Sequence, residues 1–234
     1  MLNSAILIKV KQRLNKLSSN DYDNIQPWQI IEAFNKGQVD WCRRNLHGTN
    51  ATREGDEQST RRIDDLQILL TSKLLTFNNK QTYYESTNFP ADYLQWKRVS
   101  VKAVQSCCPT PKIMVVYLGE VANVDELLRD KNKQPSYEWG ETFATISDNQ
   151  IQIYTNKQFD ISESRLHYYR QPTYIQIAGV ANPYTGITSN VDVPSEFKDD
   201  LVEVFVDEAV KILAGDIESM NQYQRMTQAV ENNN

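Results

Sequence analysis

A long amphipathic pattern between Val193 and Asn234 constrains the fold more than any other feature of this sequence. Pro194 and Ser195 mark the start of a predicted helix, and acidic residues follow where the free amide groups of a first turn favour negative charge. Apolar residues then recur close to the helical period, so one face of the helix must pack against a core. The residues that we expect to anchor this helix are Phe197, Leu201, Phe205 and Leu213.

The pattern becomes sparse beyond Ile217, where apolar residues are separated by Asn and Gln. A helix end of this kind is explained better by docking onto a neighbouring protein than by completion of a core. We therefore predict an assembly interface in this stretch. Its expected contact residues are Met220, Tyr223, Gln224, Met226 and Val230.

The first part of the chain, 1–76, is also predicted to be helical. Apolar spacing indicates one helix over 3–17, and Pro27, which suits a first helical position, begins a second helix that Gly48 ends. The polar segment 48–60 is expected to be an exposed loop, and 63–70 fits a short helix.

The middle of the chain, 82–190, has the pattern of a β-rich body. The alternation of apolar residues over 93–105 changes phase, which indicates a β-bulge, and Ser147-Asp148-Asn149 is typical of a tight hairpin turn. Strands are predicted over 82–86, 93–105, 113–118, 142–146, 150–154, 165–170 and 173–177. Helices, then strands, then a C-terminal helix and tail over 194–230 predict an α+β fold with a mostly antiparallel sheet. We expect the whole chain, 1–234, to form a single domain.

The composition is that of a soluble globular protein: 24% of the 234 residues are charged and 40% are hydrophobic. The net charge of −5 disfavours a dedicated nucleic-acid-binding protein, and the 8 glycines disfavour phosphate-binding loops. Three cysteines without a framework spacing suggest a reducing compartment. We predict neither a signal peptide nor a membrane span, because no apolar run approaches about 20 residues.

Candidate chemistry is weak throughout the sequence, which contains none of the common nucleotide-binding, zinc-protease or serine-hydrolase motifs. Cys42 and His47 are five positions apart and do not share a helical face, so packing explains Cys42 better than catalysis. The acidic pair Asp64-Asp65 is explained by charge at a helix start. We therefore predict no catalytic residue, no cofactor and no metal ligand.

Three segments together resemble structural proteins of tailed bacteriophages. They are Phe-Pro-Ala-Asp-Tyr-Leu at 89–94, Leu-His-Tyr-Tyr-Arg-Gln-Pro at 166–172, and Val-Pro-Ser-Glu-Phe at 193–197. Their order and spacing resemble the ring-forming head-to-tail connector (adaptor) proteins of short-tailed phages such as the crAss-like group. The resemblance covers roughly residues 60–234, and no individual contact residue is transferred from the family.

The resemblance implies a non-enzymatic virion protein, assembled in the bacterial host cytoplasm and located at the head-tail interface. It implies a dodecameric homo-oligomeric ring that joins the portal protein to other connector or tail rings, with double-stranded DNA passing non-specifically through the channel. An acidic chain suits such a channel, because few basic groups are available to hold phosphates. The alternatives are another tail or capsid-vertex structural protein and a small-molecule enzyme with an unrecognised site.

Overall fold

The computed structural model describes residues 1–14, 25–47, 64–106, 108–183, 186, 188–216, 224 and 226–228. The chain contains both helices and a large mixed sheet, which confirms the α+β class. It divides into two compact units, one formed by 1–68 with 172–234 and the other by 69–171. We call them the helical unit and the sheet unit. The prediction of a single domain over 1–234 stays a prediction.

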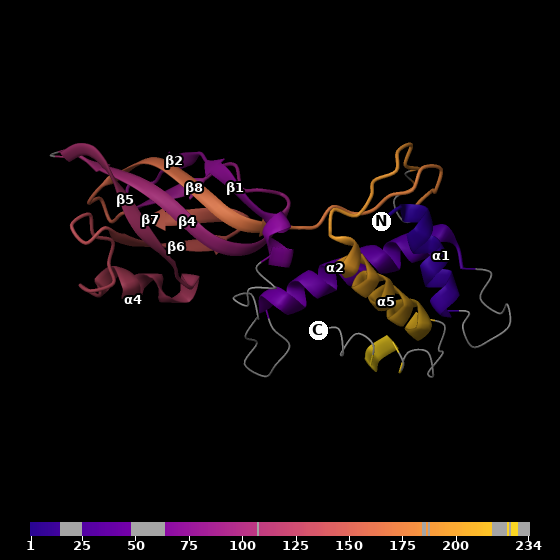
Figure 1. Ribbon diagram of the computed structural model, residues 1–234. Coiled ribbons are helices and arrows are strands. Elements are labelled where there is room, and N and C mark those ends of the chain that lie inside the picture. Colours follow the sequence, from indigo (N-terminus) through magenta and orange to yellow (C-terminus); the bar gives the residue numbers. More distant parts are fainter. Residues whose placement is uncertain are drawn as a thin grey trace. The chain divides into compact units, whose positions relative to one another are not determined.

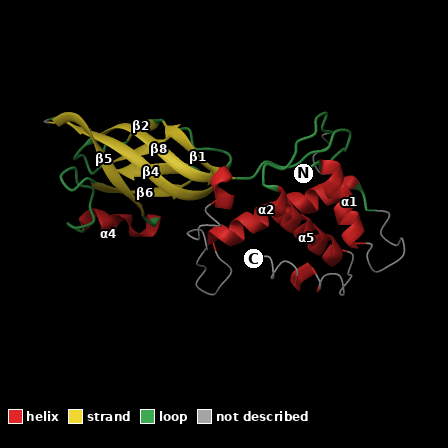
Figure 2. Ribbon diagram, viewed as in Figure 1, coloured by secondary structure: helices red, strands yellow, loops and turns green. Residues whose placement is uncertain are grey.

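The helical unit contains three main helices in its described part: α1 (Asn3–Leu14), α2 (Pro27–His47) and α5 (Asp199–Asp216) (Figures 1 and 2). Helix α2 begins at Pro27, as predicted. Helix α5 begins later than predicted, because Glu196 accepts a hydrogen bond from the Thr173 backbone N–H at 2.8 Å and holds the preceding residues outside the helix. The predicted loop over 48–60 lies outside the described residues.

An aromatic cluster fills the core of the helical unit. Phe205 is fully buried, and its ring lies edge-on to Phe197, Trp41 and Phe34 at centroid distances of 5.0, 5.5 and 5.9 Å. Helix α2 can approach α5 closely at Gly37, where an added Cβ would meet the Glu208 Cβ at 3.0 Å. The C-terminal helix is therefore a core element over the length described.

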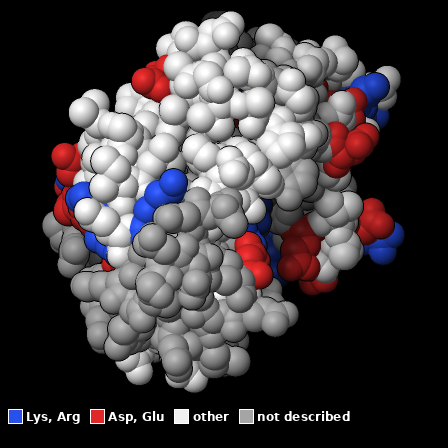
Figure 3. Space-filling view, turned by 90° about the vertical axis from the view of Figure 1, so that its right-hand side faces the viewer, with Lys and Arg blue, Asp and Glu red and all other residues white. Residues whose placement is uncertain are grey.

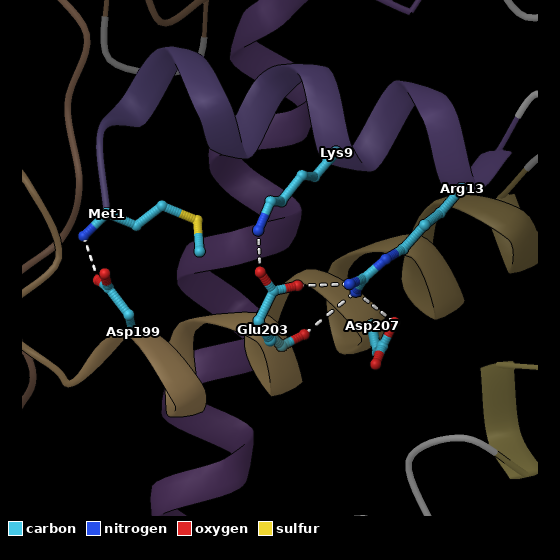
Figure 4. Close-up of polar contacts among 6 residues, drawn as sticks. All are labelled: Met1, Lys9, Arg13, Asp199, Glu203 and Asp207. Carbon is cyan, nitrogen blue, oxygen red and sulfur yellow. Dashed lines mark hydrogen bonds and ion pairs between the residues drawn. The ribbon is translucent and has the colours of Figure 1, made fainter.

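Ion pairs attach α1 to α5. Lys9 and Arg13 both contact Glu203, and Arg13 also contacts Asp207 (Figure 4). Burial raises the pKa of the Asp207 carboxyl above its ordinary value, although Arg13 acts in the opposite direction. These contacts join segments from opposite ends of the chain, so the helical unit is completed only when both segments are present.

The sheet unit contains eight strands in the order β1-β8-β4-β5-β6-β7-β3-β2. Of the strand pairings described, the pairing of β5 with β6 is parallel and the others are antiparallel. The short helix α4 (Val124–Arg129) lies between β5 and β6 in the chain. The strands are β1 (Leu70–Leu75), β2 (Phe77–Asn79), β3 (Tyr83–Ser86), β4 (Tyr93–Gln105), β5 (Cys108–Leu118), β6 (Glu141–Ser147), β7 (Gln150–Tyr154) and β8 (Asp160–Arg170).

The sheet closes on itself, because its two terminal strands are consecutive in the chain. β1 pairs with β8 at one end, β2 pairs with β3 at the other, and Thr76 alone separates β1 from β2. The Thr76 carbonyl accepts a hydrogen bond from Thr87 at 2.9 Å, and the Asn88 side chain binds the backbone at Thr76 and Leu74. The enclosed core includes Val101, Ile151, Ile153 and Leu166.

Two local predictions in this unit are confirmed. The register between β4 and β8 shifts between Trp96 and Arg98, which is the bulge that the phase change indicated. The β6–β7 turn places Asp148 and Asn149 at φ values of 49° and 54°, a left-handed conformation that these residue types tolerate in hairpins.

One predicted strand is absent, and one observed strand was not predicted. Residues 173–177 form no strand and make only the isolated bridge between Gln176 and Val193, because the Asn35 side chain binds the backbone of Ile175 in place of a neighbouring strand. The short helix predicted over 63–70 is present at 64–66 and continues as a 3₁₀ turn at Gln67–Leu69. Strand β1, which follows it, was not indicated by the sequence.

Candidate interaction surface

The outward face of β5 exposes apolar side chains. Ile113, Val115 and Tyr117 are 72%, 52% and 55% exposed, whereas Met114 between them is buried in the core. Successive side chains of a strand point to opposite faces, so these three form one row, which we call the β5 strip. The outward face of a half-buried antiparallel strand is normally polar, and a contiguous apolar row is typical of a contact surface.

Polar residues border the β5 strip on β4 and, opposite Val115, on β6. On β4, Lys102 lies opposite Ile113 and Ser100 lies opposite Val115. On the other side, Glu141 of β6 pairs with Val115. An apolar centre with a polar rim is the usual composition of a protein–protein interface.

The next strands of the same sheet carry positive charge. Arg98 of β4 lies opposite His167 of β8. Arg165 lies two positions before His167 on β8, opposite Ser100 of β4. The pKa of His167 is lowered by burial, with further lowering by the Arg98 and Arg165 charges. The β5 strip is therefore flanked on its β4 side by a cationic area, which favours an acidic partner surface.

A hydrogen-bonded turn beside the β5 strip exposes Trp139, which is 79% accessible. Lys112 donates hydrogen bonds to the carbonyls of Tyr137 and Glu138 at 2.9 and 2.7 Å, and the Trp139 N–H donates to Ser136 Oγ at 3.3 Å. These bonds fix the backbone around the indole. An exposed Trp on a fixed turn is a common anchor of protein interfaces.

Gly140 connects this turn to the β5 strip. Its carbonyl accepts a hydrogen bond from the Val115 N–H at 2.7 Å, and its φ of +73° lies in the left-handed region that favours glycine. An added Cβ would lie 3.2 Å from Lys112 Cε. Gly140 therefore allows Lys112 to hold the turn against the strand.

The residues predicted as helix anchors are all buried. Phe197 and Phe205 belong to the aromatic cluster, and Leu201 and Leu213 are 3% and 5% exposed. These side chains are held in the core of the helical unit, so their contribution to any assembly is indirect.

The residues predicted as the assembly interface are placed only in part. Gln224 and Met226 are helical, with Gln224 exposed and Met226 half-buried, whereas Met220, Tyr223 and Val230 lie outside the described residues. The prediction for this stretch stays a prediction. The β5 strip and Trp139 are a separate surface that the sequence analysis missed. The unbroken apolar run Ile113–Leu118 in a mostly antiparallel sheet was the available signal.

The candidate catalytic and metal-binding side chains take part in packing and ion pairing. Cys42 is buried, and burial, followed by the charge of Glu196, raises the pKa of its thiol to about 12, so the thiol stays protonated at neutral pH. Asp64 pairs with Lys198. The described residues contain no cluster of His, Cys, Asp and Glu side chains suited to a metal ion.

Comparison with known proteins gives no family assignment, because no protein-family model matches the chain and no curated protein sequence is similar to it. Among the helices of the described ranges, none has the length and apolar character needed to span a bilayer.

Proposed function

We propose that this chain is a structural virion protein that forms a ring in the head-to-tail connector of a short-tailed bacteriophage, between the portal and the tail. In this role the protein acts through contacts with copies of itself, with the portal protein and with neighbouring rings. Double-stranded DNA passes through the channel that the ring encloses.

The observation that carries the proposal is the β5 strip together with Trp139. Exposed apolar groups gain about 25 cal/mol for each Å² that an interface removes from water, so a row of them with a fixed Trp favours association. The polar rim and the cationic area on β4 and β8 add orientation to that contact. The resemblance of three sequence segments to connector proteins supplies the place of the ring in the virion.

Mixing the purified chain with the portal protein encoded by the same genome tests the proposal. We expect native mass spectrometry to detect a complex with several copies of the chain and negative-stain microscopy to show a ring on the portal. A chain that stays monomeric alone, with portal and with neighbouring ring proteins would refute the proposed function.

A matched pair of variants connects this test to the surface. Val115→Lys places a charge in the centre of the β5 strip and is expected to abolish ring formation. Leu74→Lys changes a similarly exposed apolar residue (49%) on β1. This control variant is expected to form rings as the wild-type chain does. Circular dichroism checks that both variants are folded.

A further inference from the structure

A basic face extends over strands β4 and β8 on the outside of the sheet unit. The two strands contain five Lys and Arg residues and two Asp and Glu residues, a net charge of +3, whereas the whole chain carries −5. Val99, Val101 and Leu166 are buried in the core, so the residues that alternate with them point outward. The bulge in β4 adds the exposed Lys97. We call this set the β4–β8 face: Lys97, Arg98, Ser100, Lys102, Arg165 and His167.

Two arginines of this face are close neighbours. Arg98 lies opposite His167 and Arg165 lies opposite Ser100, so the two arginines occupy a diagonal of the strand pairing. Diagonal neighbours of an antiparallel pair are about 7–8 Å apart. Burial, followed by the charges of Arg98 and Arg165, lowers the pKa of His167, so both guanidinium groups act on the imidazole.

Neither arginine has a carboxylate partner within the described ranges. The acidic neighbour on these strands, Glu163, accepts a hydrogen bond from Lys102 at 2.7 Å, and Arg165 donates to the Ser72 hydroxyl of β1 at 3.4 Å. Like charges at neighbouring positions of a sheet are destabilising. An anion bound between the two arginines removes that repulsion and gains charge-assisted hydrogen bonds.

The charges of the helical unit are arranged differently. Lys9 and Arg13 of α1 are neutralised by Glu203 and Asp207 of α5 (Figure 4). On the face drawn in Figure 3, most Lys and Arg residues lie next to Asp or Glu residues. A polyanion is therefore attracted to the β4–β8 face more strongly than to α1 and α5.

The composition of the β4–β8 face matches a nucleic-acid backbone better than a protein surface. A protein–protein contact has an apolar centre, which in this unit is the β5 strip, whereas the β4–β8 face has only polar and charged side chains. Interfaces with DNA are more polar and much more positive. The planar guanidinium groups of Arg98 and Arg165 bind phosphate oxygens with paired N–H donors, and the Ser72 hydroxyl can donate beside them.

The neighbouring aromatic side chains favour duplex over single-stranded nucleic acid. Proteins that bind single strands stack the bases on exposed aromatic rings. The exposed rings on the β5 side of this face are Tyr117 and Trp139. Tyr117 donates a hydrogen bond to Glu141 at 3.4 Å, and Glu138 precedes Trp139 in the chain, so both rings lie next to a carboxylate that repels a phosphate strand. The backbone of a duplex is bound by cations without stacking.

We infer that the β4–β8 face binds the phosphate backbone of double-stranded DNA independently of its sequence. Arg98 and Arg165 contact neighbouring phosphates, and Lys97 contacts a third. The inference goes beyond the proposed function and does not require a ring. Within the proposed ring this face would line the DNA channel, and that placement alone rests on the proposed function.

Fluorescence anisotropy with two short labelled duplexes of unrelated sequence tests the inference. The wild-type chain is expected to bind both duplexes equally. Because three cations displace counterions from the DNA, the affinity should fall about 40-fold for a fourfold rise in salt concentration. Absence of binding at low salt, or binding that salt does not weaken, would overturn the inference.

A matched pair of double variants locates the contact. Arg98→Gln with Arg165→Gln removes the two arginines, so the slope of log affinity against log salt concentration should change from about −2.7 to about −0.9. Lys131→Gln with Lys133→Gln changes the net charge equally in the connection between α4 and β6, and this control is expected to bind like the wild-type chain. Equal losses in both double variants would show that net charge alone determines binding, which contradicts the inference.

The pKa of His167, followed by NMR, provides a second measurement on the wild-type chain itself. Binding of the duplex is expected to raise this pKa, because phosphates counteract the charges of Arg98 and Arg165 that lower it. The Arg98→Gln, Arg165→Gln variant should have a raised His167 pKa without DNA. A His167 pKa that saturating duplex does not change would show that DNA binds elsewhere, and the inference would then be wrong.

Polyglutamate distinguishes DNA from an acidic protein surface. A duplex carries one charge per about 1.7 Å of its axis, so polyglutamate at the same concentration of charge is expected to displace little of the bound duplex. Displacement of most of the duplex would show that this face prefers carboxylates and would refute the inference.

Failure of the inference and failure of the proposed function are distinguishable. If the chain forms rings on the portal but shows no salt-dependent binding of duplex DNA, the inference fails and the proposed function stands. If the chain binds DNA through Arg98 and Arg165 but joins neither itself nor the portal, the inference stands and the proposed function fails.

Discussion

Substitution of Phe205 measures how strongly the C-terminal helix is bound into the core. The Phe205 ring is fully buried and lies edge-on to three aromatic rings. Truncation of a buried Phe to Ala costs about 3–5 kcal/mol of unfolding free energy, and each aromatic pair contributes about 0.5–1.5 kcal/mol beyond its buried area. We therefore expect Phe205→Ala to cost about 5 kcal/mol, at the upper end of the range.

Phe205→Leu separates the two contributions. Leu fills most of the space but cannot form ring pairs, so we expect it to cost about 2 kcal/mol. The Leu variant is also a safeguard, because a loss of about 5 kcal/mol can unfold a unit whose total stability is about 5–15 kcal/mol. Ile8→Ala, at a position of α1 that is 56% exposed, is the control and is expected to change stability by less than about 0.5 kcal/mol.

Hydrogen exchange with mass spectrometry locates the effect within the molecule. Peptides from α2 and α5 are expected to lose protection in Phe205→Ala, while peptides from β4 and β8 keep theirs, because the two units have separate cores. Equal losses for the Ala and Leu variants, or a loss below about 1.5 kcal/mol for Ala, would refute the assignment of α5 as a core helix.

Three further predictions follow from polar contacts. Arg44→Met leaves the Glu208 carboxylate, which is 6% exposed, without its ion-pair partner. Urea unfolding should show that the free energy of unfolding falls by about 3–5 kcal/mol, and a change near zero would contradict a buried ion pair. Asn35→Ala removes both hydrogen bonds to the Ile175 backbone, so the unfolding free energy should fall by about 1–3 kcal/mol and the Ile175 amide should exchange faster. Unchanged exchange would show that Asn35 does not hold this backbone segment. The lowered pKa of His167 means that the folded state binds the imidazole proton less tightly than the unfolded state does. The folded protein therefore loses stability as the pH falls below the ordinary His pKa of about 6.5. The melting temperature of His167→Gln should fall less between pH 7.5 and pH 5 than that of the wild-type protein.

The elements that the sequence predicts well are those with local signals. The bulge at Lys97 changes the phase of the alternation within one strand, and the turn at Asp148-Asn149 needs residues that tolerate a left-handed conformation. The buried face of α5 is likewise encoded by its own apolar spacing. In each case neighbouring residues contain the whole signal.

The elements that the sequence does not predict depend on distant partners. Strand β1 exists because it pairs with β8, far along the chain, and the backbone of Ile175 is held by Asn35, 140 positions away. The candidate surface was missed for a related reason. An apolar run such as Ile113–Leu118 does not show which of its faces is covered, and the turn that exposes Trp139 is fixed by Lys112 from another strand.

The discontinuous helical unit has a consequence for synthesis of the chain. Helices α1 and α2 leave the ribosome first, but α5, which covers Phe34 and Trp41, follows about 150 residues later, or about 8–30 s at the usual rates of synthesis. The sheet unit is continuous and can fold within that interval. Nascent chains therefore pass through a state in which the sheet is complete and the apolar faces of α1 and α2 await α5, and this state is the point at which aggregation or chaperone binding acts on the protein.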